Sequence, residues 1–143
     1  MSLELVPLCM ATVTPQPPID LGQTPAGHRL MVTIGEAVWE GKRLRARLKG
    51  GTVAADWMVI GPDGTGFIDI RLTLETHDGA LIYVSYQGRR DIAQVMGGID
   101  APVYIMPRFE TNDERYAWLN KVQAVGKGTE WGDSRVYEIY ELR

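Results

Sequence analysis

The chain has 143 residues, of which 45% are hydrophobic and 23% are charged, and its net charge at neutral pH is −3. This size and composition suit one folded domain, residues 1–143, with a single core. Nucleic acid is not an expected partner of an acidic chain, because binding to phosphates depends on clustered Lys and Arg.

Cys9 is the single cysteine, so the chain cannot form an internal disulfide. It lies in an apolar strand pattern, which favours a buried and inert thiol. The chain does not begin with a basic segment followed by a long apolar run, and about 18 consecutive apolar residues occur nowhere. We expect a cytoplasmic protein without a membrane partner.

The first third of the chain alternates apolar runs with a proline-rich stretch. A strand is predicted at residues 3–13, with Pro7 at an edge, a bulge or a strand end. Residues 14–27 contain four prolines and two glycines and are predicted to form a loop. This loop is interpreted equally well as a lid over a site or as a clamp across a barrel end. Further strands are predicted at 28–38 and 44–48.

Residues 55–88 are predicted to form three consecutive antiparallel strands joined by two Asp-Gly turns. The middle strand alternates with a strict period of two. One face carries Phe67, Asp69, Arg71, Thr73 and Glu75, and the other carries Ile68, Ile70, Leu72 and Leu74. One face is therefore largely charged and the other is aliphatic.

After Gly88 the pattern changes, and residues 90–96 are predicted to form a short helix. The last predicted strands span residues 104–111, 116–125 and 135–142. About nine strands with at most one short helix indicate an all-β fold. We predict a single antiparallel β-barrel, since closure removes the unpaired edges of a long meander.

Five short motifs follow one another along the chain. They are Gly50-Gly51 with Ala55-Asp56-Trp57, Asp69-x-Arg71, Asp78 to Tyr83, Pro107 to Thr111, and Tyr116 to Asn120. In this order they resemble the DUF3237 family, also called UPF0311, over nearly the whole chain. The resemblance implies a small-molecule-binding β-barrel, usually oligomeric, with relatives in biosynthetic (secondary) or aromatic metabolism and cofactor-free cyclases among the fungal ones. Tyr104 departs from the arginine that many relatives have there.

Polar and aromatic residues in or near these motifs are the candidates for a site. Residues two apart on a strand point to the same side, so Asp69 shares a face with Arg71, and Arg108 with Glu110. The pattern alone favours a surface ladder of opposite charges, whereas the resemblance favours a shared polar cavity. The predicted catalytic residues are Asp69, Asp56, Arg71 and Tyr83, and the predicted substrate-binding residues are Arg108, Glu110, Asn120, Trp57, Trp118 and Tyr104.

Two arrangements of the meander are possible. If the aliphatic face points into the barrel, it forms an ordinary core and the charged face is solvated. If the charged face points inward, it lines a polar cavity, and the aliphatic face needs cover from another subunit. We predict the second arrangement, and with it a homo-oligomer, either a dimer or a tetramer.

Two functions remain open for such a barrel. The first is a cofactor-independent cyclase, isomerase or lyase acting on a small cyclic or aromatic oxygenated metabolite. In it, Asp69 or Asp56 removes a proton while Arg71 and Tyr83 stabilise the oxyanion. The second is a non-catalytic barrel that binds such a molecule. In both, Asp69 is predicted to be the most sensitive residue.

No metal and no cofactor are predicted. The two histidines, His28 and His77, lie in no metal-ligand pattern. The glycine-rich run at residues 61–66 has the composition of a turn between strands, not of a phosphate loop that leads into a helix.

Overall fold

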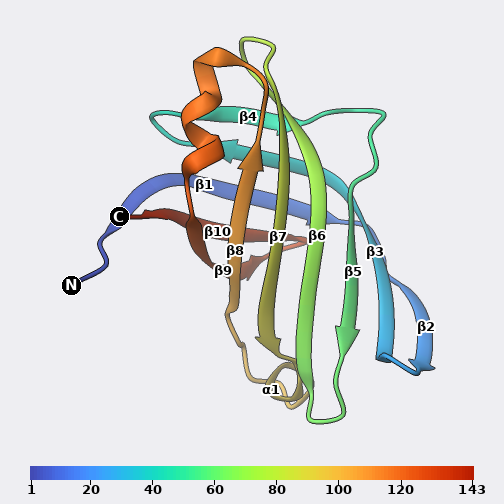
Figure 1. The fold of residues 1–143 in the computed structure, drawn as a ribbon. Helices are drawn as coiled ribbons and strands as arrows, with labels where there is room; N and C mark the ends of the chain where they lie inside the picture. The colour runs from blue at the N-terminus through green and yellow to red at the C-terminus, as the bar shows by residue number, and fades with distance from the viewer.

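Ten strands, all antiparallel to their neighbours, form one continuous sheet in the computed structural model, which describes residues 1–143 (Figure 1). The strands are β1 (Leu5–Pro15), β2 (Ile19–Thr24), β3 (Gly27–Glu40), β4 (Arg45–Leu48), β5 (Ala55–Ile60), β6 (Thr65–Thr76), β7 (Leu81–Asp91), β8 (Val103–Glu110), β9 (Ala124–Trp131) and β10 (Ser134–Leu142). A short helix α1 (Ile92–Met96) lies where a helix is predicted, and a 3₁₀-helix η1 (Glu114–Lys121) follows β8. Neither has the length and apolar character that crossing a membrane requires.

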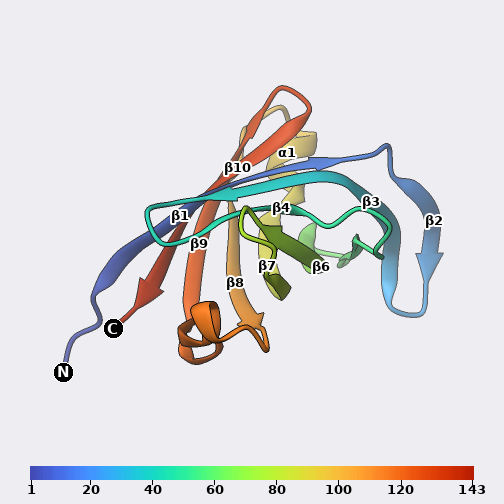
Figure 2. The same ribbon diagram turned by 90° about the horizontal axis from the view of Figure 1, so that it is seen from above.

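The sheet closes on itself because β3 has partners along both edges. On one edge it pairs with β1 and then with β2, and on the other with β4 and β5, which both pair with β6. From β1 the ring continues through β10, β9, β8, β7 and β6. Seen from above, β2 extends the sheet beside β3, away from the ring (Figure 2). Eight strands thus close the barrel and two are additional, which confirms the predicted antiparallel barrel.

Alternate residues of β6 point into the barrel and away from it. The inward side chains are Ile68, Ile70, Leu72 and Leu74, with exposed fractions between 0% and 6%. The side chains of Asp69 and Arg71 lie on the outer surface, 33% and 53% exposed. The predicted arrangement, with the charged face inward and the aliphatic face covered by another subunit, is therefore wrong.

The physical reason is the difference in burial energy between the two faces. Burial of each aliphatic side chain stabilises the folded state by about 1.5–3 kcal/mol relative to leaving that side chain in water. A buried ion pair loses its hydration, and this loss can exceed the attraction between the charges. Since the barrel encloses one face only, the aliphatic face is the one enclosed. Oligomerisation stays a prediction, but the aliphatic face of β6 does not support it, because that face lies inside the barrel.

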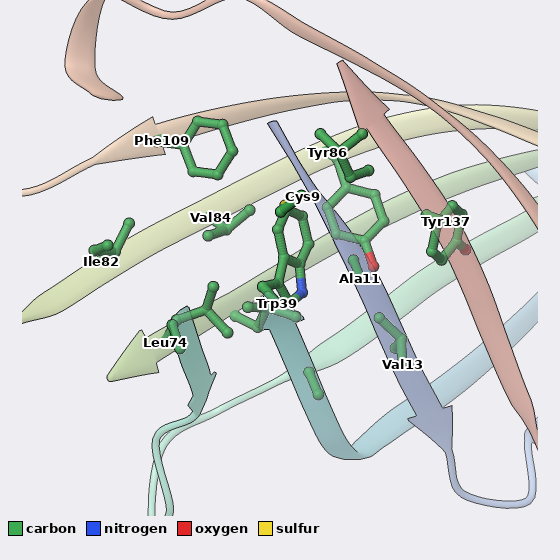
Figure 3. Packing of buried hydrophobic residues seen from close by; sticks show 14 of the residues in the cluster. Cys9, Ala11, Val13, Trp39, Leu74, Ile82, Val84, Tyr86, Phe109 and Tyr137 are labelled. Atoms are coloured by element: carbon green, nitrogen blue, oxygen red, sulfur yellow. The ribbon is translucent and has the colours of Figure 1, made fainter. Parts of the chain in front are cut away.

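Large aromatic side chains fill the middle of the barrel (Figure 3). The ring centroid of Trp39 lies 6.0 Å from that of Phe109 and 6.1 Å from that of Tyr86. The ring of Tyr86 in turn lies 6.2 Å from that of Tyr137. Phe109 is on one side of Trp39 in Figure 3, and the two tyrosines are on the other. All four rings belong to one cluster of 26 buried residues that forms the core.

The proline-rich stretch 14–27, predicted as a loop, carries the end of β1 and the whole of β2. Pro15 is the last residue of β1, and Pro17 and Pro18 lie in the break between the two strands. Pro25 lies in the turn before β3. A proline lacks the N–H that a ladder needs, so prolines at strand ends and turns are compatible with pairing in between.

Residues 116–125, predicted as a strand, form most of η1 and only the start of β9. Asp113 begins the helix, since its carboxylate accepts a hydrogen bond from the N–H of Arg115 at 2.9 Å. Tyr116 and Leu119, three residues apart, are both buried. A spacing of three brings them onto one side of a 3₁₀-helix.

Candidate functional site

A cavity of about 250 Å³ lies inside the barrel at the end near α1. Its wall is mostly aliphatic, with side chains from β1, β3, β5, β6 and α1. Five polar residues also line it: Gln16, Asp56, Arg90, Arg135 and Tyr137. An apolar cavity with a few convergent polar groups is the usual form of a small-molecule site.

Asp56 is the one carboxylate that lines the cavity. On β5 it shares the inward side with Met58 and Ile60, and it is 7% exposed. Its Oδ1 accepts a hydrogen bond from the backbone N–H of Asp69 at 3.0 Å. Burial raises the pKa of Asp56 from 3.8 to about 6, although that hydrogen bond and the charge of Arg135 act to lower it. A carboxyl group with this pKa can both donate and accept a proton near neutral pH.

Two arginines reach the cavity from β7 and β10. The Nη1 atoms of Arg90 and Arg135 both donate to Oε1 of Glu130, at 2.9 and 2.8 Å. The hydrogen bond from Arg90 is the main cause that lowers the pKa of Glu130, and the charge of Arg135 adds to it. Glu130 is therefore ionised at neutral pH and joins the guanidinium groups of these two cavity-lining arginines.

Two tyrosines lie side by side near the same cavity. Tyr137 lines it and is 2% exposed, and burial raises the pKa of its phenol to about 12. Tyr86 is buried behind it, and its hydroxyl has no hydrogen-bond partner. Burial is the main cause that raises the pKa of Tyr86, with smaller contributions from Tyr137 and Asp56. Both phenols therefore stay protonated and remain hydrogen-bond donors at neutral pH.

The proline-rich connection between β1 and β2 forms part of the cavity rim. Pro15, Gln16 and Pro18 line the cavity from this side, and Ile92 of α1 is a further lining residue. The stretch therefore lies at the site, as both the lid and the clamp interpretations require. Its movement as a lid stays a prediction.

Potential metal ligands and nucleophiles do not gather at the cavity. No three or more His, Cys, Asp or Glu side chains form a group that could hold a metal ion. Cys9 belongs to the packed core, and burial raises the pKa of its thiol to about 12. The thiol is therefore not ionised at neutral pH and does not act as a nucleophile there.

Of the predicted site residues, Asp56 alone lines the cavity. Five of the other predicted residues lie on the outer surface of β6, β7 and β8: Asp69, Arg71, Tyr83, Arg108 and Glu110. Ser85 of β7 lies between Arg71 and Arg108 on the neighbouring strands. Tyr83 lies beside Glu110. The nearest oxygen of Asp69 and nitrogen of Arg71 are 3.6 Å apart. These residues form the surface ladder, so their predicted place in an interior cavity is wrong. The barrel encloses the opposite side of each strand.

An open groove of about 510 Å³ lies on this outer surface, between the strands and η1. Tyr83, Arg108, Glu110 and Asn120 line it, so four predicted residues do come together. Asn120 makes two hydrogen bonds, of 2.8 and 2.9 Å, with the backbone of Thr111. Its side chain therefore attaches η1 to the end of β8.

The three remaining predicted residues are aromatic and lie apart from the cavity. Trp57 is on the outer side of β5, where the guanidinium of Arg71 lies 5.4 Å from its ring centroid. Trp118 is half-buried on η1 and packs against the core. Tyr104 is 54% exposed on β8.

Sequence reasoning missed Arg90, Arg135 and Tyr137. The signal that points to them is strand alternation. Arg90 is four residues after the buried Tyr86 on β7, and Arg135 is two residues before Tyr137 on β10. Each arginine therefore falls on the inward side of its strand. A charged residue on an otherwise aliphatic side is the pattern that marks an interior site.

Known proteins resemble the chain in sequence. The sequence model of a family described as "Protein of unknown function (DUF3237)" matches residues 3–142. A UPF0311 protein of Clostridium acetobutylicum is 28% identical over 119 residues, which cover 76% of this chain and 74% of that protein. A hydroalkoxylation enzyme of Penicillium herquei is 26% identical over 135 residues, which cover 94% of this chain and 80% of the enzyme.

Solved structures resemble it in fold. A β-barrel-like protein of Acinetobacter baumannii, 34% identical, superposes with a TM-score of 0.86 over 100% of this chain and 98% of that one. An enzyme of Penicillium herquei, 24% identical, superposes with a TM-score of 0.76 over 99% of this chain and 94% of that one. The second similarity shows the shared fold alone.

Proposed function

The chain belongs to the DUF3237 family, and we propose that its interior cavity performs cofactor-independent acid–base chemistry in which Asp56 transfers the proton. The observation that carries the proposal is the buried carboxyl group of Asp56, with its pKa raised to about 6, in an aliphatic cavity. The similar protein of Penicillium herquei is named a hydroalkoxylation enzyme. That reaction consists of proton transfer and C–O bond formation, without a change of oxidation state.

Hydroalkoxylation adds an O–H group across a carbon–carbon double bond. In the proposed reaction, protonated Asp56 gives its proton to one carbon of the double bond, and the substrate hydroxyl oxygen bonds to the other carbon. The hydroxyl proton then returns to the carboxylate, so Asp56 ends in its starting state. The product is a cyclic ether with the elemental composition of the substrate, and the reverse reaction is a lyase-type ring opening.

The surroundings of Asp56 support this chemistry in two ways. The aliphatic wall keeps water away from the electron-poor carbon that forms when the double bond is protonated. The phenol of Tyr137, which stays protonated, is a donor for a substrate oxygen. Binding in this cavity also holds the hydroxyl oxygen and the double bond close together, which lowers the entropic part of the barrier.

The test is turnover of small alkenols and alkenyl phenols in D₂O, followed by mass spectrometry and NMR. The wild type is expected to yield a cyclic isomer with one new carbon-bound deuterium. Asp56→Asn keeps the size of the side chain and one acceptor oxygen but loses the transferable proton, so turnover is expected to fall about 100-fold or more. Asp69→Asn, with its carboxylate on the outer surface, is the matched control and is expected to stay within about threefold of the wild type.

A folded Asp56→Asn variant that turns over at the wild-type rate contradicts the proposal. A 100-fold loss in Asp69→Asn instead would move the site to the outer surface. Saturable binding of panel members without any turnover would favour the second function, a non-catalytic barrel that binds a small molecule.

A further inference from the structure

The wall of the cavity includes a guanidinium group that is only partly hydrogen-bonded. Arg135 lines the cavity, and its side chain is 33% exposed. Its one hydrogen bond runs from Nη1 to Glu130, at 2.8 Å. A guanidinium has five N–H donors, so Nε and Nη2 of Arg135 are still able to donate to a ligand.

Arg90, by contrast, is buried, and the protein holds its guanidinium group at Nε and Nη1. Its side chain is 5% exposed, Nε donates to the carbonyl oxygen of Ala101 at 3.1 Å, and Nη1 donates to Glu130 at 2.9 Å. Its Nη2 lies 3.8 Å from Oδ1 of Asp100. Arg90 therefore fixes Glu130, and Glu130 uses the same oxygen to hold Arg135.

The charges around the cavity leave an excess of positive charge. Arg90 and Arg135 face the single carboxylate of Glu130 at close range, and Asp100 is 70% exposed, so water screens its weaker contact. Asp56 is neutral when it carries its proton, and the phenols of Tyr86 and Tyr137 are neutral at neutral pH. While Asp56 carries its proton, as it does increasingly below about pH 6, two arginines against one close carboxylate leave one unbalanced positive charge beside an aliphatic wall.

We propose that the cavity binds an organic monocarboxylate with an apolar body, whose carboxylate is bound by Arg135 while Glu130 and Arg90 hold Arg135 in position. The planar guanidinium group matches a carboxylate through two parallel hydrogen bonds, and such charge-assisted bonds are among the strong ones. The aliphatic wall takes the hydrocarbon part. The inference rests on the proposed function and narrows its substrates to unsaturated hydroxy carboxylates.

The test uses octanoate and octanamide, which have nearly the same shape and differ in charge. Binding is followed by the methyl NMR signal of Met58, which lines the cavity, with exposed Met106 as the signal that does not shift. At about pH 6, the wild type is expected to bind octanoate about tenfold or more tightly than octanamide. Arg135→Gln is expected to abolish this preference while octanamide affinity changes less than about twofold.

Arg89→Gln is the matched control for the loss of one positive charge. Arg89 lies on the same strand as Arg90 but on the outer surface, with its guanidinium 4.5 Å from the ring centroid of Phe67. This variant is expected to keep the tenfold preference. Glu130→Ala tests the positioning role, because loss of a negative charge alone would raise octanoate affinity. If Glu130 positions Arg135, octanoate affinity falls several-fold instead.

The inference is overturned if the wild type binds the two probes with equal affinity, or if Arg135→Gln keeps the preference for octanoate. In either case the cavity binds apolar molecules without recognising the carboxylate through Arg135. A rise of octanoate affinity in Glu130→Ala overturns the positioning role. If neither probe shifts the Met58 signal, the inference fails, and the turnover of wild type and Asp56→Asn decides the proposed function separately.

Discussion

The interior of the barrel near α1 and the outer surface of β6, β7 and β8 carry the same kinds of side chain in different surroundings. Inside, Asp56 is almost without contact with water, and burial raises its pKa to about 6. Outside, Asp69 lies in a solvated ladder beside Arg71. The side of the strand, more than the residue type, therefore decides whether a carboxyl group is buried, and burial is what raises the pKa of Asp56.

The largest expected effect is a loss of stability, and it distinguishes the inner side of β6 from the outer side. Leu72→Ala removes a fully buried side chain and is expected to lower the free energy of unfolding by about 2–5 kcal/mol. Arg71→Ala, one residue earlier on the outer side, is the control and is expected to lower it by less than about 1 kcal/mol. Urea denaturation of both variants measures the difference.

Similar losses of stability in the two variants would contradict the assignment of inner and outer sides. A Leu72→Ala variant that keeps its stability as a monomer, but in which an oligomer dissociates, would restore the arrangement with the aliphatic side at a subunit contact. Light scattering on the same samples distinguishes these results.

Asp56→Asn is expected to stabilise the protein above about pH 6. The folded pKa of about 6 lies above the ordinary 3.8, so the unfolded chain loses its proton first as the pH rises. The contribution of Asp56 to the free energy of unfolding therefore falls between about pH 4 and pH 6 and stays low above that. A shift of this size corresponds to up to about 3 kcal/mol. Urea denaturation of wild type and variant at several pH values gives the difference.

The effect of Asp56 is obtained from the difference in free energy of unfolding between the variant and the wild type. The difference is needed because other carboxyl groups change the stability of both proteins with pH in the opposite direction. Pairing with Arg90 and Arg135 lowers the pKa of Glu130, for example, so its contribution is lost as the pH falls. Asp69→Asn is again the matched control. A stability gain in Asp56→Asn that persists unchanged below pH 4 would show that burial of the charge is not its cause.

The sequence was sufficient for the architecture and for the alternation on single strands. The period of two on β6, the Asp-Gly turns and the lack of long helical patterns predicted an antiparallel barrel, which the structure confirms. Which side of β6 lies inside follows from this alternation, because a closed barrel encloses the aliphatic side. The closure itself depends on pairs such as Ala11 with Trp39, which lie far apart in the sequence. Local pattern contains no information on such pairs.

The lack of information on distant pairs also explains why two arginines of the candidate site were not predicted. Asp56 was found because it belongs to a motif, while Arg90 and Arg135 stand outside all five motifs. Alternation along β7 and β10 indicates their inward direction, but their meeting at one cavity depends on the places of these strands in the ring. Arg135 is the neighbour of Glu130 across the β9–β10 hairpin, but the ion pair of Glu130 with Arg90 joins residues 40 positions apart, and no spacing in the sequence indicates it.

The most direct test of the account is the ionisation of Asp56 itself, followed through the carboxyl carbon by ¹³C NMR as the pH is raised. Proton transfer inside the barrel depends on the burial of this group, and burial predicts a titration midpoint of about 6. Bound octanoate, through its negative charge, should move the midpoint upward. A midpoint close to the ordinary 3.8 would contradict a functional site inside the barrel, since the carboxyl group of Asp56 would then be solvated.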